Sequence, residues 1–228
     1  MTMSSAVFGT TPRSLVAVPQ CAAPVRLIVI EAHPVTRIGL LSVLNAERDM
    51  MVVGAAADLH TGLELVDEWS PAAVLIDPDL TGTDGPAAVR ALLARSPSLR
   101  VVALGQHDGD EEIHAILAAG ACGYLFKSAP VDEIVAAIRD ARAGRTCVSL
   151  HARQRLEERR RLPDLTPRER EVLALIAEGQ CNATIAAVLE IKRGTVKLHV
   201  RSILAKLGVE DRAQAALVAL RRGFVRMV

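Results

Sequence analysis

Three polar residues each stand at the end of a short apolar run in the N-terminal half of the chain. Glu31 follows VRLIVI, Asp77 ends AAVLID, and Lys127 follows CGYLF. If these runs are strands of one parallel sheet, their carboxyl ends share an edge, and we expect the three side chains to converge there. A carboxylate beside a lysine is a workable phosphoryl acceptor, because phosphoryl transfer needs positioning and charge neutralisation above all. The alternative for Asp77, taken alone, is that it caps the following loop.

The apolar runs that would position these residues alternate with segments of helical periodicity. Five runs, VRLIVI, MVVGAAA, AAVLID, LRVVAL and CGYLF, are separated by helical segments such as residues 34–45 and 62–69. Nearly continuous apolar strands are typical of a parallel sheet covered by helices on both faces. The sequence therefore predicts an α/β domain over residues 25–145, a doubly wound (βα)5 sheet of flavodoxin-like type.

A second domain begins near Leu165 with strong helix-start residues. Thr166 is a capping hydroxyl, Pro167 occupies the first helical position, and Glu169 is a carboxylate that can reach back to the cap. Further turn residues divide the rest into short helices, with Gly179, Asn182, Gly194 and Gly208 at the divisions. Two helices joined by a tight turn, the second of them basic, predict a helix-turn-helix in a small all-α domain of four helices over residues 164–228.

The third helix of this domain has one apolar stripe, formed by Val196, Val200, Ile203 and Leu207. Leu198 points the opposite way, between Lys197 and Arg201. In a major groove, a leucine can touch thymine methyls while the cations bind phosphates or guanine edges. An ordinary amphipathic helix with a surface leucine is the alternative. The predicted DNA-contacting residues are Lys192, Arg193, Thr195, Lys197, Leu198 and Arg201.

The segments LTPRERE, GTVKLHV and KLGVEDR resemble the LuxR-type helix-turn-helix of the NarL/FixJ group of bacterial response regulators. The resemblance implies that the chain binds double-stranded promoter DNA as a homodimer, or as a heterodimer with a related regulator. It also implies that the last helix, residues 210–222, takes part in that pairing, with Ala213, Ala216, Leu217 and Leu220 on one side. Lys192 departs from the family, which usually begins its recognition helix with Ser or Thr; the lost cap should cost about 0.5 to 2 kcal/mol.

The segments EAHP, LID and GYLFKSAP resemble the receiver domain of two-component signalling. This resemblance implies that Asp77 is the phosphoacceptor, that Lys127 contacts the phosphoryl group, and that Tyr124 occupies the aromatic switch position. It also implies a sensor kinase as partner. A magnesium ion would depend on Glu31, Asp77 and Asp79.

Two positions depart from the receiver pattern. Ala32 stands where the family has a second acid, which predicts weakened magnesium binding, so that no cofactor is required. Gly105 stands where the family has Ser or Thr, so no hydroxyl links a phosphoryl group to the aromatic switch. We therefore expect control by dimerisation, by a partner regulator or by a ligand. Conventional activation through Asp77 is the alternative.

A rival interpretation makes the chain an enzyme. LIDPDLTGT also fits the DxDxT motif of haloacid-dehalogenase-type phosphatases, in which Asp77 and Asp79 would be the nucleophile and the acid-base carboxylate. That family opens on its first strand, whereas two strand-helix units precede the motif here. We therefore expect a protein that is not an enzyme.

The net charge of +1 conceals an asymmetry between the two halves of the chain. Residues 24–145 carry 10 basic and 17 acidic side chains, whereas residues 146–228 carry 16 basic and 9 acidic ones. A basic rear half suits a domain that meets a polyanion, with chance asymmetry as the alternative. The four cysteines show no CxxC spacing and suggest neither a metal site nor a disulfide framework.

Two segments lie outside the predicted domains. Residues 1–24 are rich in small and polar residues and predict a disordered extension. Residues 146–163 are rich in arginine and glutamate and predict a solvated linker.

The remaining composition bears on location and host. No uncharged apolar run reaches the roughly 18 residues that span a bilayer, and proline interrupts the leader-like SLVAVPQCAAPV. We expect a cytoplasmic bacterial protein with no membrane partner. The chain contains 23 arginines and only 4 lysines. In this composition and in its altered pocket it resembles the sporulation regulators of filamentous actinobacteria.

Overall fold

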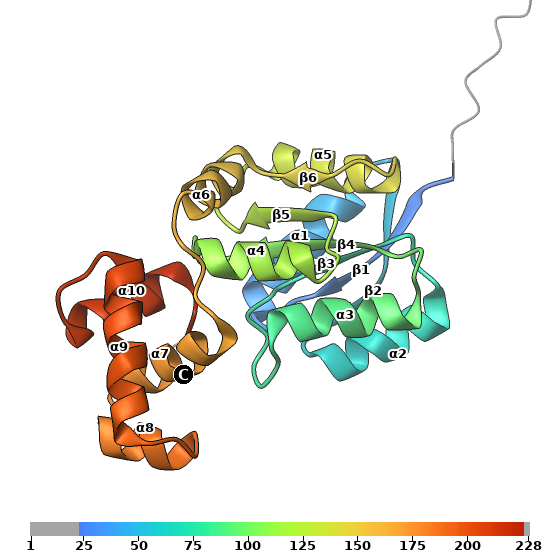
Figure 1. The fold of residues 1–228 in the computed structure, drawn as a ribbon. Helices are drawn as coiled ribbons and strands as arrows, with labels where there is room; N and C mark the ends of the chain where they lie inside the picture. Colours follow the sequence, from blue (N-terminus) through green and yellow to red (C-terminus); the bar gives the residue numbers. More distant parts are fainter. Residues whose placement is uncertain (1–22, 226–228) are drawn as a thin grey trace, which may run out of the picture.

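A six-stranded parallel sheet forms the centre of the N-terminal region in the computed structural model, which describes residues 23–225 (Figure 1). Its strand order is β2-β1-β3-β4-β5-β6. The strands are β1 (Val25–Ile30), β2 (Met50–Ala56), β3 (Ala73–Ile76), β4 (Arg100–Gly105), β5 (Gly123–Phe126) and β6 (Cys147–Val148). The predicted disordered extension, residues 1–24, lies almost wholly outside the described residues.

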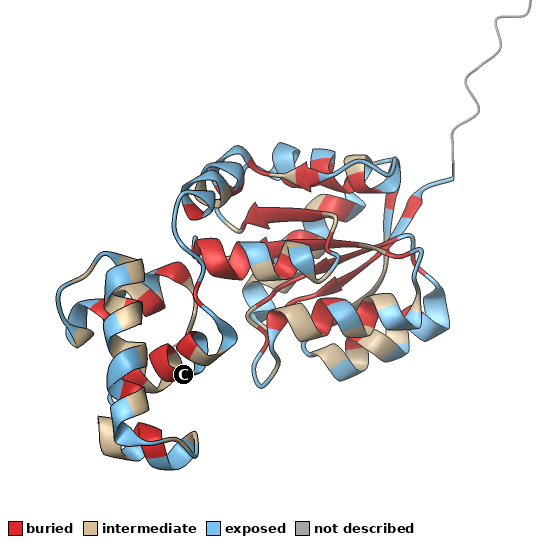
Figure 2. Cartoon of the chain, in the orientation of Figure 1, coloured by how far each residue is buried: buried red, intermediate tan, exposed pale blue. Residues whose placement is uncertain are grey.

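Helices cover both faces of this sheet. Residues of α1 and α5 pack with one set of strand side chains, and residues of α2, α3 and α4 pack with the other set. Figure 2 shows that the inner strands β1, β3, β4 and β5 are mostly buried, whereas most of the edge strand β2 is only partly buried. The helices are α1 (Pro34–Asn45), α2 (Leu59–Trp69), α3 (Gly85–Arg95), α4 (Asp110–Ala118) and α5 (Val131–Arg142). This arrangement confirms the predicted α/β fold, because apolar strands need a helical layer on each side.

The segment between the two regions is not the solvated tether that its composition predicts. After β6 pairs with β5, helix α6 (Leu150–Arg160) packs against α4. Ala152 is fully buried, and Arg159 binds Glu111 at 3.1 Å and Asp164 at 2.9 Å. The sequence did not predict this packing, because the buried residues of α6 are the small Ala152 and the charged Arg159, whose guanidinium is paired. Such residues do not form a recognisable apolar face.

The C-terminal region is a bundle of four helices with its own core, as predicted. The helices are α7 (Pro167–Ala177), α8 (Asn182–Val188), α9 (Arg193–Leu207) and α10 (Arg212–Arg222). Val172, Ile185, Val196 and Ile203 are fully buried in this core. Within the described part of the chain, no helix combines the length and the apolar character needed to cross a membrane.

The inward face of α10 is only partly the one predicted, in which part of the face with Ala213, Ala216, Leu217 and Leu220 closes the core: Ala216 packs against the core. Ala215 and Ala219 are fully buried, whereas Leu217 is 57% exposed. Asp211 begins the helix by accepting a hydrogen bond from the backbone of Gln214. The helix is turned so that Arg222 also faces inward. The pattern of apolar residues could not predict this orientation, because arginine is rarely buried.

A cluster of charges joins the two regions. Asp110 and Glu111, in the first turn of α4, are buried, and the Arg222 guanidinium lies 3.0 Å from the first carboxylate and 2.9 Å from the second. Arg170 of α7 lies 3.5 Å from Glu111. Carboxylates suit the N-terminal turn of a helix, where the helix dipole is positive. Because buried carboxylates need counter-charges, this cluster fixes the end of α10 against the sheet domain.

A second charged group stabilises the helical bundle from inside. The capping box predicted at the start of α7 is present, with Thr166 and Glu169 each bonded to the backbone of the other. Glu169 also accepts hydrogen bonds from Ser202 and Lys206 of α9, both at 2.6 Å. Burial of Glu169 opposes its charged form, but these hydrogen bonds outweigh it and lower the pKa from 4.5 to about 2.

We predict that Glu169→Gln destabilises the protein at pH 7 by about 2 kcal/mol, because Lys206 loses its charged partner. The pKa of Glu169 is lower in the folded state than its ordinary value of 4.5. The stability that its charge adds is therefore complete above that value and is lost as the pH falls toward 2. Urea unfolding followed by circular dichroism should show the gap between wild type and variant narrowing below pH 4.5. A gap that is unchanged between pH 7 and pH 3 would contradict this account.

Candidate functional site

The carboxyl ends of β1, β3 and β5 bring three charged side chains together, as the sequence predicted. Glu31 and Asp77 are each only 1% exposed. The Lys127 ammonium lies 2.7 Å from an oxygen of Asp77 and 2.9 Å from an oxygen of Glu31. One lysine therefore bridges two buried carboxylates that stand 46 positions apart in the sequence.

The electrostatics of this pocket favour a charged lysine. Burial opposes the charged form of Lys127, but hydrogen bonds from its ammonium to Asp77 and Glu31, together with their negative charges, outweigh the burial and raise its pKa. The ammonium thus supplies one positive charge to two carboxylates. The pocket holds a fixed cation at the position where an incoming anion would need one.

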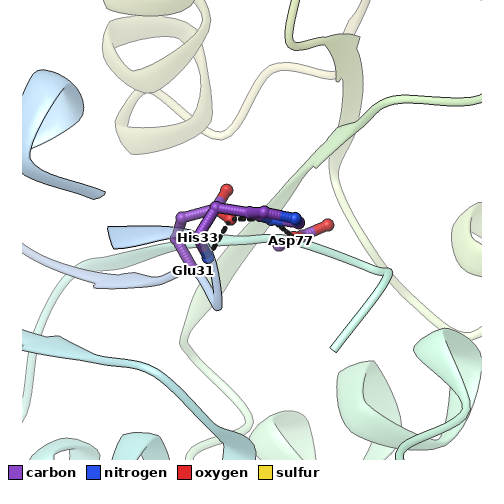
Figure 3. A group of neighbouring side chains, drawn as sticks. All are labelled: Glu31, His33 and Asp77. Carbon is purple, nitrogen blue, oxygen red and sulfur yellow. Dashed lines mark hydrogen bonds and ion pairs between the residues drawn. The ribbon is translucent and has the colours of Figure 1, made fainter. Parts of the chain in front are cut away.

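His33, which lies in the EAHP segment, is a further member of the site. No role for it was predicted from the sequence. Its ring nitrogen Nδ1 lies 3.1 Å from Glu31 and 3.9 Å from Asp77, and its backbone N–H donates to Glu31 at 2.9 Å (Figure 3). The His33 side chain is 63% exposed, so it closes the pocket from the solvent side. Its place two residues after Glu31 was the available signal.

The donor atoms of Glu31, His33 and Asp77 lie within 4.8 Å of one another and could hold a metal ion. Two carboxylates suit magnesium, whereas an imidazole nitrogen suits softer divalent ions better. Asp79, which the sequence predicted as a further ligand, is not a member of this group, but its backbone N–H donates to Asp77 at 2.9 Å. Ala32 supplies no ligand.

Gly105 and Tyr124 fit together at the next strand end. Tyr124 is fully buried, and its hydroxyl donates to the carbonyl of His107 at 3.1 Å. A Cβ atom at position 105 would stand 2.0 Å from that hydroxyl, closer than any real contact. The glycine therefore makes the room that the inward tyrosine ring occupies.

The second predicted site, on α9, presents a basic face to solvent. Leu198 is 68% exposed, and Lys197 and Arg201 on either side of it are also exposed. Lys192 and Arg193 are exposed at the start of the helix, and Thr195 is half-buried. Val196 and Ile203 face the core instead. Figure 1 shows α9 extending along one side of the bundle, beside α8.

The start of α9 lacks a side-chain cap. Lys192 stands at the N-cap with extended backbone angles and forms no capping hydrogen bond. This agrees with the expectation drawn from its residue type, because a lysine offers no oxygen to the exposed backbone N–H groups. The Lys192 side chain is thus left exposed beside the uncapped N-terminus of α9.

Both regions match known families. Residues 27–139 match the response regulator receiver domain, and residues 163–219 match the bacterial regulatory proteins of the luxR family. The transcriptional regulatory protein LiaR of Bacillus subtilis is 36% identical over 209 residues, which covers 88% of this chain and 99% of LiaR. The nitrate/nitrite response regulator protein NarL of Escherichia coli is 33% identical over 204 residues, which covers 85% of this chain and 94% of NarL.

Solved structures show the same fold. A structure of two RcsB dimers bound to two parallel DNAs superposes with a TM-score of 0.67 at 24% identity, and the match covers 87% of this chain and 98% of that one. At this identity the likeness is one of fold. It extends over both regions, the sheet domain and the helical bundle.

We predict that Gly105→Ala displaces the Tyr124 ring, because the added methyl group would overlap its hydroxyl. Tyr124 is the only tyrosine in the chain, so nitration by tetranitromethane reports on its ring alone. Wild type should resist nitration in the folded state, and the variant should react several times faster. An equal rate in both proteins, with unchanged circular dichroism, would mean that the ring does not depend on the glycine.

Proposed function

The chain belongs to the bacterial response regulators that join a receiver domain to a LuxR-type helix-turn-helix, and we propose that it binds promoter DNA through α9 and works without conventional phosphorylation. Members of this family are DNA-binding transcription factors and not enzymes. The haloacid-dehalogenase interpretation of Asp77 and Asp79 is therefore set aside. The observation that carries the proposal is the inward Tyr124 ring beside Gly105.

The exposed side chains of α9 support the assignment of the DNA contacts. Leu198 lies between Lys197 and Arg201, so an apolar contact to thymine methyls can combine with cationic contacts to guanines or phosphates. Lys192 and Arg193 would bind phosphates at the start of the helix. Among these residues Thr195 is half-buried, and its hydroxyl would contact the backbone of the DNA.

We propose that two copies bind together. A single helix-turn-helix buries little surface on DNA, so two half-sites about one helical turn apart are expected. Leu217, exposed on α10, would lie in the contact between the two copies. The pair is a homodimer or a heterodimer with a related regulator, and the RcsB dimers on DNA provide the analogy of fold.

The geometry around Tyr124 supports control that does not depend on phosphorylation. In a receiver with Ser or Thr at position 105, a hydroxyl drawn toward the phosphoryl group would vacate space for the aromatic ring. Here Gly105 leaves that space free of side-chain atoms, and the ring already fills it. We infer that dimerisation, a partner regulator or a ligand sets the activity of the protein.

The pocket supports weakened magnesium binding. Glu31 and Asp77, with the exposed His33 beside them, are the residues whose side chains would hold the ion, and Asp79 is the further ligand that the sequence predicts. A bound divalent cation would neutralise charge on a phosphoryl oxygen. Ala32 adds no carboxylate, and Lys127 already supplies positive charge to the same two acids, which reduces the gain from binding the ion.

A second candidate mechanism is conventional activation. Asp77 keeps its carboxylate, and Lys127 lies 2.7 Å from it, so a sensor kinase could still find both a phosphoacceptor and a charge partner. This mechanism needs a magnesium ion to be held without the second acid. We favour the first mechanism because of the inward tyrosine.

Three further proposals concern the location of the protein in the cell, its domain boundaries and its biological role. We propose a cytoplasmic location, since a promoter-binding bacterial regulator acts where the DNA lies. The proposed domain division is residues 25–145, 146–163 and 164–228, with β6 of the linker completing the receiver sheet. A role in actinobacterial sporulation is proposed on composition and on the altered pocket alone.

We predict that Lys197→Ala or Arg201→Ala reduces the affinity for a selected promoter fragment by tenfold or more at physiological salt. Each variant removes an exposed cation from the groove face of α9 without touching the core. Affinity is measured by fluorescence anisotropy on fragments selected from genomic DNA. Arg160→Ala is the matched control, because it removes an exposed arginine on α6, remote from α9. Equal affinity in all four proteins would contradict the assignment of α9.

We predict that Ala32→Asp raises the affinity for magnesium by about tenfold, because it adds a carboxylate beside Glu31 and Asp77. Isothermal titration calorimetry of both proteins measures the change. Tight magnesium binding by the wild type, unaffected by Ala32→Asp, would show that Glu31 and Asp77 already form a complete site. The weakened-pocket proposal would then fail, whereas the DNA-binding proposal would stand.

A further inference from the structure

Two cysteines meet at the edge of the sheet, away from the pocket and from α9. Cys122 immediately precedes β5, and Cys147 is the first residue of β6. The backbone N–H of Cys147 donates to the carbonyl of Cys122 at 2.9 Å. The register pairs Cys147 with Gly123, so this hydrogen bond joins Cys147 to the residue one position before its direct partner, and the two cysteines are diagonal neighbours. Sequence patterns could not predict that the two cysteines are neighbours, because 24 residues separate them.

Both thiols lie on the same side of the sheet, against the same apolar cluster. The Cys147 thiol lies 3.6 Å from the carbonyl oxygen of Cys122, and the Cys122 thiol lies 3.3 Å from the carbonyl oxygen of Val101. A Cβ atom at Gly123 would stand 2.2 Å from the Cys147 sulfur. Because Gly123 has no side chain, the Cys147 sulfur can occupy the space beside it, next to Cys122.

The surroundings make the two thiols chemically unequal. A hydrogen bond with the Cys147 thiol, opposed by burial and aided by the charge of Arg100, lowers the pKa of Cys122 to about 7. The same hydrogen bond, together with burial, raises the pKa of Cys147. The more exposed Cys122 is thus the one of the pair that more readily becomes a thiolate, and the buried Cys147 more readily stays protonated. This is the arrangement of an attacking cysteine and a resolving cysteine.

The two cysteines differ in how they meet the solvent. Cys122 is partly exposed. Cys147 is buried, but it lines an open cavity of about 140 Å³ together with Asp140 and Thr146. An oxidant of a few atoms fits this cavity, whereas a protein thiol would not enter it.

We propose that Cys122 and Cys147 form a redox-active dithiol that a small hydroperoxide converts to an intrachain disulfide. The Cys122 sulfur attacks the terminal oxygen of the hydroperoxide, the O–O bond breaks, and the released alkoxide takes a proton to leave as an alcohol. The Cys147 sulfur then attacks the sulfenic acid on Cys122 and expels hydroxide, which takes the Cys147 proton and leaves as water. The dithiol loses two electrons and two protons, and the hydroperoxide is reduced.

The crosslink would act on the connection between the two domains. β6 leads through Ser149 into α6, which packs on α4 and carries Arg159 to the charge cluster at Glu111. A disulfide from Cys147 to Cys122 would fasten β6 to the sheet at the start of this connection. Oxidation is therefore expected to raise the thermal unfolding midpoint of the sheet domain by several degrees.

The test uses the reduced full-length protein treated with hydrogen peroxide, then with an alkylating agent, and digested for mass spectrometry. We expect a linked pair of peptides containing Cys122 and Cys147, about 2 Da lighter than the sum of the reduced peptides because two hydrogens are lost. The exposed Cys181, whose pKa a hydrogen bond with Thr184 also lowers to about 7, should react with peroxide without entering the linked pair of peptides. Alkylated Cys122 and Cys147 at concentrations that already oxidise Cys181 would overturn the proposal.

Variants separate the two roles. In Cys147→Ala, Cys122 should stop at the sulfenic acid, which a dimedone probe captures. In Cys122→Ala, Cys147 should not react. Cys181→Ala and Cys21→Ala are the controls and should form the linked peptide as wild type does. Equal dimedone labelling of Cys147→Ala and Cys122→Ala would overturn the assignment of roles, and the wild-type peptide map keeps the proposal testable should either variant fail to fold.

Discussion

Two carboxylates buried at one edge of a parallel sheet need a cation, and Lys127 provides it. Asp77 and Glu31 end different strands, and both are almost completely shielded from water. Without the ammonium between them their repulsion would oppose the packing of β1 against β3. The ion pairs therefore fix the ends of three strands, and they also decide the chemistry, since an ion or phosphoryl group entering the pocket must reorganise them.

A continuous set of contacts leads from this edge to the DNA-binding domain. The Tyr124 ring fills the space beside Gly105 and binds the carbonyl of His107, in the loop that precedes α4. Asp110 and Glu111 then begin α4 and bind Arg222 at the end of α10. Because the tyrosine is already inward, the loop before α4 has a defined conformation without any modification of Asp77. The basic face of α9 remains open to solvent in this arrangement.

The sequence correctly predicted the features that depend on hydrophobic periodicity and on local capping or turn residues. It located the strand ends with Glu31, Asp77 and Lys127, because apolar runs in a parallel sheet end at a common edge, and the capping box at Thr166, because that motif is local. It failed where burial involved charge or distant pairing. Arg159 and Arg222 are buried through partners far along the chain, so neither the packing of α6 nor the rotation of α10 had an apolar signature. Likewise, the two cysteines become neighbours only because β6 pairs with β5, which places Cys147 opposite Gly123 and bonds its backbone N–H to the carbonyl of Cys122.

The most direct test of phosphorylation-independent DNA binding is the affinity of the full-length protein for genomic fragments selected in vitro, measured with and without a small acyl phosphate plus magnesium. We predict specific binding with the same dissociation constant in both conditions, because the tyrosine is inward and Lys127 already pairs with both carboxylates of the pocket. Specific binding that appears only with the phosphoryl donor, and that Asp77→Asn abolishes, would contradict it. That result would mean that Glu31 and Asp77 hold the metal without a second acid at position 32.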